Sequence, residues 1–219
     1  MTETQLEIAD AVWRAVNAHG HTGLELEFRL GHRLPGGTFS SNVGKDAFHK
    51  IQKVLDESTK LWDAVYDVDT IDLIHSGSKH VTTTQHTKDG QPLPLPPPRW
   101  MTKTKIRAVD YDFSPKDTPF VARASIAIEQ FAPAEGQPPP TTARRIKHRR
   151  RYAYKCWAFD LTQVQSTLPG DLDNDDMSYE IEVELADPGM LFERTMDGIA
   201  EWGMALLEDL VQMTLIPQN

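Results

Sequence analysis

The chain has 219 residues, of which 39% are hydrophobic, enough for one domain, or at most two small ones, with a substantial core. Its single cysteine, Cys156, excludes an internal disulfide framework and a cysteine-rich zinc site. A formal net charge of −9 argues against broad, nonspecific binding of nucleic acid. No apolar run approaches the roughly 18 residues of a membrane span. The first residues show no basic-then-apolar leader, so we expect an intracellular protein that is not secreted and does not enter a membrane.

The expected elements begin with an amphipathic helix over residues 4–18, where Leu6, Val12 and other apolar residues recur at three- and four-residue spacing. Residues 24–30 alternate strictly between apolar and charged side chains, which predicts a strand with one apolar and one charged face. Residues 46–57 have the periodicity of a second helix.

Short strands are expected between residues 60 and 130; one proline-rich loop, 92–98, interrupts them and a second, 138–140, follows them. The candidate strands cover residues 70–74, 80–84, 100–109 and 122–130. A basic strand then begins at residues 144–151, where six of eight side chains are lysine or arginine, and we expect it to continue through Asp160 towards Val164.

A late strand is expected at residues 179–185, which again alternate between apolar and acidic side chains. Asp187 and Pro188 then form a typical helix start and predict a long C-terminal helix. The whole chain, 1–219, is therefore predicted to be a single domain of the mainly β, α+β class. Its parts are a helix at about 4–18, an antiparallel β barrel at about 22–186 and a helix at about 188–214.

Three charged rows follow from the alternating segments, because side chains at i and i+2 point to the same face of a strand. The rows are Glu25, Glu27 and Arg29; Arg145, Lys147, Arg149 and Arg151; and Glu180, Glu182 and Glu184. One acidic row alone is best explained as the solvated outer face of a sheet. Two acidic rows and a basic row together favour charged faces that meet inside a closed sheet.

Such an interior has the chemistry to hold a metal-bound polyphosphate. Carboxylates at strand spacing suit hard divalent cations such as Mg²⁺ and Mn²⁺. Rows of arginine and lysine bind phosphate oxygens, arginine often in bidentate fashion.

These blocks resemble the fungal and protozoan RNA 5′-triphosphatases of mRNA capping, which are triphosphate tunnel metalloenzymes. Residues 25–31 resemble the family's first metal-binding strand, and residues 180–184 resemble its closing acidic strand. Residues 145–149 with 152 and 159–164 resemble its basic strand and the continuation of that strand, and residues 114–117 with 125–129 resemble the intervening hairpin. The four blocks occur in the family's order, and the resemblance covers about residues 24–195.

The resemblance implies a closed eight-stranded antiparallel barrel, the triphosphate tunnel, with flanking helices. It also implies hydrolysis of the γ-phosphate from the 5′-triphosphate end of nascent RNA with Mn²⁺ or Mg²⁺, which leaves a 5′-diphosphate end for capping. Hydrolysis of nucleoside triphosphates with Mn²⁺ is a related expectation.

The resemblance also implies roles for the matching residues. The metal ligands would be Glu25, Glu27 and Glu184. Metal-bound or attacking water would be held by Glu180 and Glu182 and oriented or deprotonated by Glu129. Phosphate oxygens would be bound by Arg29, Lys103, Arg145, Lys147 and Arg149, and by His80 where the family has an arginine. Asp160 would hold basic residues in place.

No nucleotidyl-transfer motif is apparent, so the resemblance implies that the guanylyltransferase partner is a separate chain. The enzyme would act in the nucleus, or in a viral replication compartment if a virus encodes it, and its C-terminal helix could serve a homodimer. Two alternatives remain open at this point. One is a tunnel enzyme for inorganic tripolyphosphate or another small triphosphate, and the other is a noncatalytic module that binds polyphosphate or RNA ends.

Overall fold

The computed structural model describes residues 2–75, 78–87, 99–113, 118–133, 140–167, 177–192 and 195–215. The helices are α1 (Glu3–His19), α2 (Lys45–Glu57), the 3₁₀ helix η1 (Pro188–Phe192) and α3 (Met196–Leu215). The strands are β1 (Leu24–Arg33), β2 (Phe39–Ser40), β3 (Ala64–His75), β4 (Ser78–Thr87), β5 (Arg99–Asp112), β6 (Val121–Pro133), β7 (Ala143–Tyr154), β8 (Trp157–Thr167) and β9 (Met177–Leu185). None of the helices within these ranges is both long enough and apolar enough to span a membrane.

Eight of the strands form a strongly curled antiparallel sheet in the order β1-β6-β5-β4-β3-β7-β8-β9. A further pairing of β1 with β9, from Glu27 opposite Glu184 to Leu30 opposite Ile181, brings the two edges of this sheet together. β2 adds a two-residue pairing at the end of β1. The expected barrel is therefore present, but it is not fully closed; among the described residues, β4 pairs with β5 over three residue pairs.

The apolar core lies outside the barrel rather than within it. Leu26 and Phe28 of β1, and Ile181 and Val183 of β9, are fully buried and belong to the hydrophobic core. The alternate residues of the same strands point into the barrel, because side-chain direction reverses at each position of a strand. This arrangement leaves the charged faces of β1 and β9 on the inside, as the alternation predicts.

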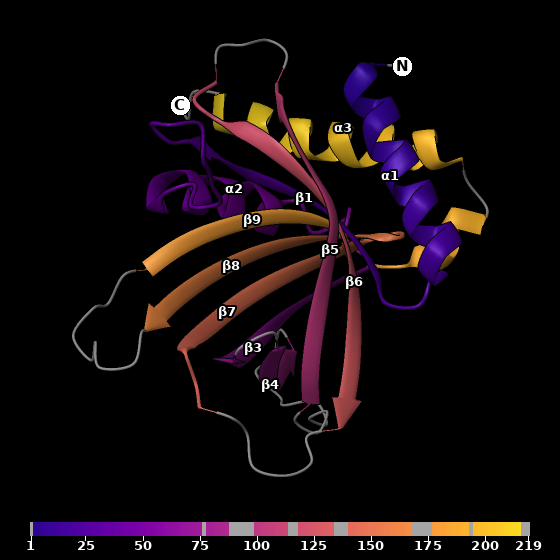
Figure 1. Ribbon diagram of the computed structural model, residues 1–219. Helices are drawn as coiled ribbons and strands as arrows, with labels where there is room; N and C mark the ends of the chain where they lie inside the picture. The colour runs from indigo at the N-terminus through magenta and orange to yellow at the C-terminus, as the bar shows by residue number, and fades with distance from the viewer. Residues whose placement is uncertain are drawn as a thin grey trace.

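The three long helices cover one side of the barrel, away from β3 and β4 (Figure 1). The ring of Phe28 lies 6.0 Å from that of Trp157 on β8, and Trp157 lies 6.0 Å from Trp202 on α3. Gly203 of α3 approaches Phe28 so closely that a Cβ there would lie 2.2 Å from the ring. The helices therefore hold β1 and β8 from outside and leave the interior free for polar side chains.

Several of the expected elements differ from the structure. The strands between residues 64 and 133 are longer than expected. The predicted strand through Asp160 is instead a hairpin, in which β7 turns at Lys155 and Cys156 and returns as β8. Lys155 adopts a left-handed conformation with φ of 55°. The segment lacks the Asn-Gly or Gly pattern that is typical of such turns. The sequence signal for the turn was therefore absent.

The C-terminal helix also begins later than expected. The carboxylate of Asp187 accepts a hydrogen bond from the backbone N–H of Gly189 at 2.9 Å, so Asp187 caps the short 3₁₀ helix η1. The long helix α3 starts at Met196. The predicted hairpin residues 114–117 and most of the two proline-rich loops lie outside the described residues.

Candidate functional site

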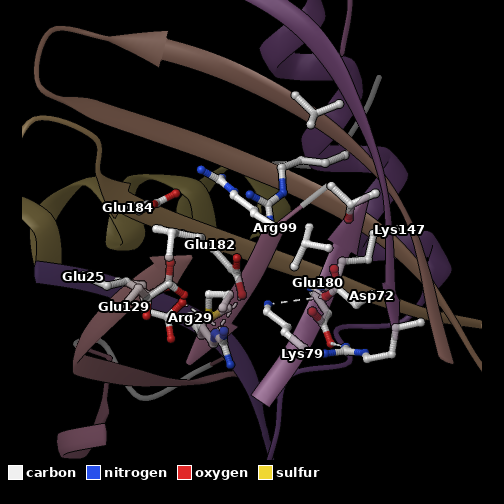
Figure 2. A pocket seen from close by; sticks show the side chains of 18 residues that line it. Glu25, Arg29, Asp72, Lys79, Arg99, Glu129, Lys147, Glu180, Glu182 and Glu184 are labelled. Atoms are coloured by element: carbon white, nitrogen blue, oxygen red, sulfur yellow. Dashed lines mark hydrogen bonds and ion pairs between the residues drawn. The ribbon is translucent and has the colours of Figure 1, made fainter. Parts of the chain in front are cut away.

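The barrel encloses a cavity of about 220 Å³ whose lining is dominated by charged side chains (Figure 2). Every strand of the ring except β8 contributes to it. The lining residues are Glu25, Glu27, Arg29, Val68, Thr70, Asp72, Lys79, Val81, Arg99, Met101, Glu129, Phe131, Arg145, Lys147, Arg149, Glu180, Glu182 and Glu184. The acidic and basic rows predicted from the sequence thus face one another across a single cavity.

Glutamates from β1, β6 and β9 gather in one part of this cavity. The pairing of β1 with β9 sets Glu27 opposite Glu184. Burial raises the pKa of Glu27 to about 7, and the nearby charge of Glu182 adds to this effect. Burial likewise raises the pKa of Glu184 to about 7. Burial acts to raise the pKa of Glu182, but the charges of Arg29 and Arg149 outweigh burial and hold this pKa at about 2. Burial therefore disfavours the charged forms of Glu27 and Glu184, whereas the neighbouring arginines keep Glu182 ionised.

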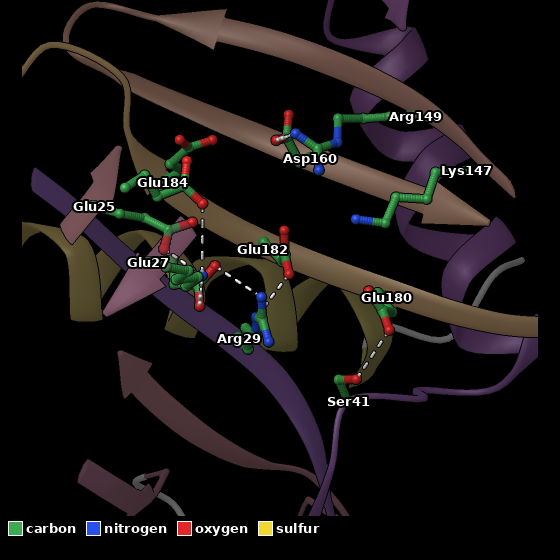
Figure 3. Close-up of polar contacts among 12 residues, drawn as sticks. Glu25, Glu27, Arg29, Ser41, Lys147, Arg149, Asp160, Glu180, Glu182 and Glu184 are labelled. Carbon is green, nitrogen blue, oxygen red and sulfur yellow. Dashed lines mark hydrogen bonds and ion pairs between the residues drawn. The ribbon is translucent and has the colours of Figure 1, made fainter. Parts of the chain in front are cut away.

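Two cationic side chains, Arg29 and Lys103, partly neutralise the cluster, and Figure 3 shows Arg29 between Glu27 and Glu182. Arg29 donates from Nη2 to Glu27 at 2.9 Å, and its Nε lies 2.7 Å from Glu182. Lys103 of β5 forms an ion pair with Glu25, and its Nζ lies 3.6 Å from Glu27 and 4.0 Å from Glu129. Glu129, predicted to act on water, is therefore near the β1 carboxylates, as its predicted role requires.

Asp160 on β8 is completely buried and holds two arginines of β7. It accepts hydrogen bonds from Arg151 Nε at 2.7 Å and Nη2 at 2.5 Å, and Arg149 Nη1 lies 3.0 Å away. Arg151 also bonds to Glu184. Asp160 therefore holds the end of the basic row, and Arg151 links that row to the acidic strand β9.

The other part of the cavity is more basic. Asp72 of β3 is 2% exposed, and its carboxylate lies 2.8 Å from Lys147 Nζ and 3.4 Å from Lys79 Nζ. Burial acts to raise the pKa of Asp72, but these two ammonium groups outweigh burial and lower this pKa below its usual range. Burial and the charge of Lys79 lower the pKa of Lys147. Beside this group, Arg145 Nη2 donates to Glu180 at 3.0 Å.

The structure brings most of the predicted site residues into the cavity lining. They are Glu25, Glu27, Arg29, Glu129, Arg145, Lys147, Arg149, Glu180, Glu182 and Glu184. Lys103 and Asp160 adjoin the lining through the ion pairs described above. His80 lies on β4, but its side chain is outside the described part of the chain, and its neighbour Lys79 lines the cavity.

Sequence reasoning missed Asp72, Lys79 and Arg99, and it did not assign a partner to Arg151. For Asp72 the sequence carries a weak signal. Asp67 and Asp69 lie at odd positions of β3 and pair on the outside with Arg150 and His148, whereas Asp72 lies at an even position. This change of parity places Asp72 on the opposite face of the strand.

The donor set suits a hard divalent cation. No ready-made group of three or more metal-ligating side chains occurs among the described residues. Each predicted ligand is instead paired with a cation: Glu25 with Lys103, Glu27 with Arg29 and Glu184 with Arg151. Burial raises the pKa values of Glu27 and Glu184 because it disfavours their charged forms, and an oxygen-preferring ion such as Mg²⁺ or Mn²⁺ would favour those charged forms.

A family model described as "mRNA capping enzyme, beta chain" matches residues 35–213 of this chain. The match begins after the acidic row of β1, so the placement of Glu25 and Glu27 rests on the geometry of the cavity. A 5′ RNA triphosphatase of Paramecium bursaria Chlorella virus 1 is 28% identical over 211 residues, which cover 95% of this chain and 98% of the viral protein.

Solved structures share the fold. The Pct1 RNA triphosphatase of S. pombe superposes with a TM-score of 0.70 at 16% identity, covering 96% of this chain and 93% of that one. Pct1 has also been solved in complex with the Spt5 CTD, with the same TM-score. The RNA triphosphatase domain of a trifunctional mimivirus mRNA capping enzyme superposes with a TM-score of 0.55 at 13% identity, covering 97% and 99% of the two chains.

Proposed function

The chain belongs to the family of the β chain of mRNA capping enzymes, and we propose that it removes the γ-phosphate from the 5′-triphosphate end of RNA. The product would be the 5′-diphosphate end to which a guanylyltransferase adds the cap. One observation carries the proposal: carboxylates and cations from seven strands meet in one barrel cavity. Phosphoryl transfer depends mainly on positioning and on neutralising charge, and such a cavity supplies both.

The basic residues would bind the triphosphate. Arg145, Lys147 and Arg149 lie at successive inward positions of β7, so their cationic groups follow the strand at intervals of about 7 Å. An extended triphosphate has negative oxygens along its length, and a row of cations can contact several phosphates at once. Asp160 keeps Arg149 in place by ion pairing, which reduces the entropy lost when the phosphate binds.

The acidic residues would hold the metal ion and the water. Glu25, Glu27 and Glu184 would bind Mn²⁺ or Mg²⁺, which would supply charge stabilisation at the reacting phosphate. Glu180 and Glu182 would hold water, and Glu129 would orient the attacking molecule or accept its proton. Glu129 is only partly buried and lies beside Lys103, so water can reach its carboxylate.

The proposal is tested by phosphate release from γ-labelled, triphosphate-ended RNA with Mg²⁺ or Mn²⁺. In parallel reactions, ATP or inorganic tripolyphosphate replaces the RNA. In a further reaction, EDTA replaces the metal. We expect release from RNA that depends on the metal and exceeds release from tripolyphosphate. Absence of release from RNA would overturn the proposal, and preference for tripolyphosphate would instead assign a small-triphosphate hydrolase. Binding to RNA ends without turnover of any substrate would indicate a noncatalytic module.

Replacing Asp72 with asparagine is expected to shift the alkaline limb of the pH profile to lower pH. Asp72 partly offsets the lowering of the Lys147 pKa by burial and by Lys79. Without the carboxylate charge, the Lys147 ammonium loses its proton at a lower pH, and phosphate binding weakens there. The measurement is kcat/KM for triphosphate-ended RNA with Mg²⁺ across neutral and alkaline pH.

Asp69→Asn is the matched control for this experiment. Asp69 lies on the same strand, but its carboxylate pairs with His148 on the outside of the barrel. The control should retain the wild-type alkaline limb. An unchanged profile in Asp72→Asn would contradict the assignment of Lys147 to phosphate binding.

The partner and the location follow from the same proposal. A separate guanylyltransferase would use the diphosphate end, in the nucleus or in a viral replication compartment. Copurification of a guanylyltransferase with the tagged chain would support this arrangement, and microscopy of the tagged chain would locate it.

A further inference from the structure

An aromatic side chain interrupts the charged lining of the cavity. Phe131 of β6 lines the cavity and is 47% exposed, whereas the other large apolar lining residue, Met101, is 4% exposed. The guanidinium of Arg99, also in the lining, lies 3.8 Å from the centre of the Phe131 ring. An exposed ring and a stacked arginine thus form one surface, the Phe131–Arg99 platform, which takes no part in the core of the protein.

The position of the platform relates it to the reacting phosphate. Phe131 lies two residues beyond Glu129 on β6, so both side chains point to the same face about 7 Å apart along the strand. The carboxylates predicted to hold the metal lie on the other side of Glu129, because Glu25 pairs with Ala127 and Glu27 with Ser125. From these carboxylates outwards, the cavity therefore presents first Glu129 and then Phe131, at the end of β6.

The aromatic ring of the platform does not suit phosphate. The face of an aromatic ring is negative and disfavours an anion, and under the proposed function the cations of β7 would bind the phosphate oxygens. Unpaired nucleobases, in contrast, stack on aromatic rings and on arginine guanidinium planes, and this stacking tolerates any base. A base attached to a triphosphate held along β7 would extend beyond the phosphates towards this end of the cavity.

We propose that Phe131 and Arg99 form a stacking platform for the terminal base of the substrate, and so favour base-bearing triphosphates over inorganic tripolyphosphate. This inference rests on the proposed function and specifies its substrate class. The ligand is a 5′-triphosphate that carries a base, either at an RNA end or as a free nucleotide. Phe131 would be a specificity-determining residue and would take no part in the transfer step.

The first test compares substrates in Phe131→Leu, which keeps an apolar side chain and removes the ring. The ratio of kcat/KM for triphosphate-ended RNA to kcat/KM for tripolyphosphate should fall about 5- to 100-fold, which corresponds to the loss of one stacked base. The effect should appear mainly in KM, and Phe131→Trp should restore the ratio. ATP is the third substrate, and an effect on ATP as large as that on RNA would show that a free nucleotide uses the same platform.

Trp13→Ala is the matched control, because Trp13 is an aromatic residue of α1 that is 56% exposed and does not line the cavity. It should leave the ratio as in the wild type. Equal losses on RNA and tripolyphosphate in Phe131→Leu would overturn the proposal, since the ring would then serve only to position Arg99. Wild-type kcat/KM for both substrates in Phe131→Leu would also overturn it.

A binding measurement separates this inference from the proposed function. RNA with 2-aminopurine as its first base and a 5′-triphosphate is titrated with the full chain in EDTA, and the free 2-aminopurine riboside triphosphate is titrated in parallel. Stacking on Phe131 should quench the fluorescence with the wild type and with Phe131→Trp, and the quenching should be lost with Phe131→Leu. Absence of quenching with the wild type would overturn the platform even if RNA is hydrolysed. Quenching without hydrolysis would support the platform and contradict the proposed function.

Discussion

Replacing Glu27 with glutamine is expected to lower kcat/KM for triphosphate-ended RNA by about 10²- to 10³-fold, equivalent to about 3–4 kcal/mol of transition-state stabilisation. Glu27 is 3% exposed and lies at the pairing of β1 with β9, opposite Glu184. Glutamine keeps the size of the side chain and can still accept the hydrogen bond from Arg29. It lacks the negative charge that a divalent cation requires, so the metal would bind weakly.

Although Glu27→Gln should be less active than the wild type, its stability without metal should not fall. Burial and the charge of Glu182 raise the pKa of Glu27 to about 7, from an unfolded value near 4.5. Between these two pH values the native state binds the additional proton, so the stability contributed by Glu27 falls as pH rises through this window. At pH 8 the metal-free wild type carries the full cost of the buried charge, and Glu27→Gln does not. Metal-free Glu27→Gln should therefore melt at or above the wild-type temperature at pH 8.

Two measurements check this prediction: single-turnover phosphate release, and thermal melting at pH 8 with EDTA or with Mn²⁺. Mn²⁺ should raise the melting temperature of the wild type and have little effect on Glu27→Gln. Glu57→Gln, an exposed substitution at the end of α2, is the matched control and should behave as the wild type in both assays. Near-normal turnover by Glu27→Gln would show that Glu27 is not a metal ligand.

Replacing Asp160 with asparagine is expected to reduce the free energy of unfolding by about 3–5 kcal/mol, because a buried charge would lose its partner. Asp160 is 0% exposed and neutralises the guanidinium groups of Arg149 and Arg151. Asparagine has nearly the same shape but no charge. Its amide offers one acceptor oxygen, and its NH₂ group is a donor, so it cannot accept hydrogen bonds from both arginines as the carboxylate does. Activity should fall as well, because Arg149 would turn towards Glu182 and leave its place in the basic row.

Urea unfolding measures the loss of stability, and its slope shows whether the native state stays compact. The double variant Asp160→Asn/Arg151→Gln supplies the control, since it also removes one of the two guanidinium groups that Asp160 holds. It should be less destabilised than the sum of the single variants, by an interaction energy of about 1–3 kcal/mol. Additive losses would show that the Arg151–Asp160 pair does not act as a unit.

Most of the charged lining could be predicted from the sequence because a strand has a side-chain period of two. The alternation in residues 24–30 and 179–185 separates apolar from charged faces without any knowledge of the neighbouring strands. The burial of Leu26, Phe28 and Ile181 against the helices then requires the glutamates to point inwards. The order of the charged blocks indicated the family, and the fold agrees with that of RNA triphosphatases.

The pairing of particular side chains could not be predicted in the same way, because it depends on which strands become neighbours. Asp72 meets Lys147, which lies 75 positions later in the chain, only because β3 pairs with β7. Arg151 meets Asp160 because the chain turns at Lys155, where the sequence suggested one continuous strand. Periodicity assigns each side chain to a face, whereas register between distant strands assigns its partner. Long-range packing sets that register, and with it the charge balance of the cavity.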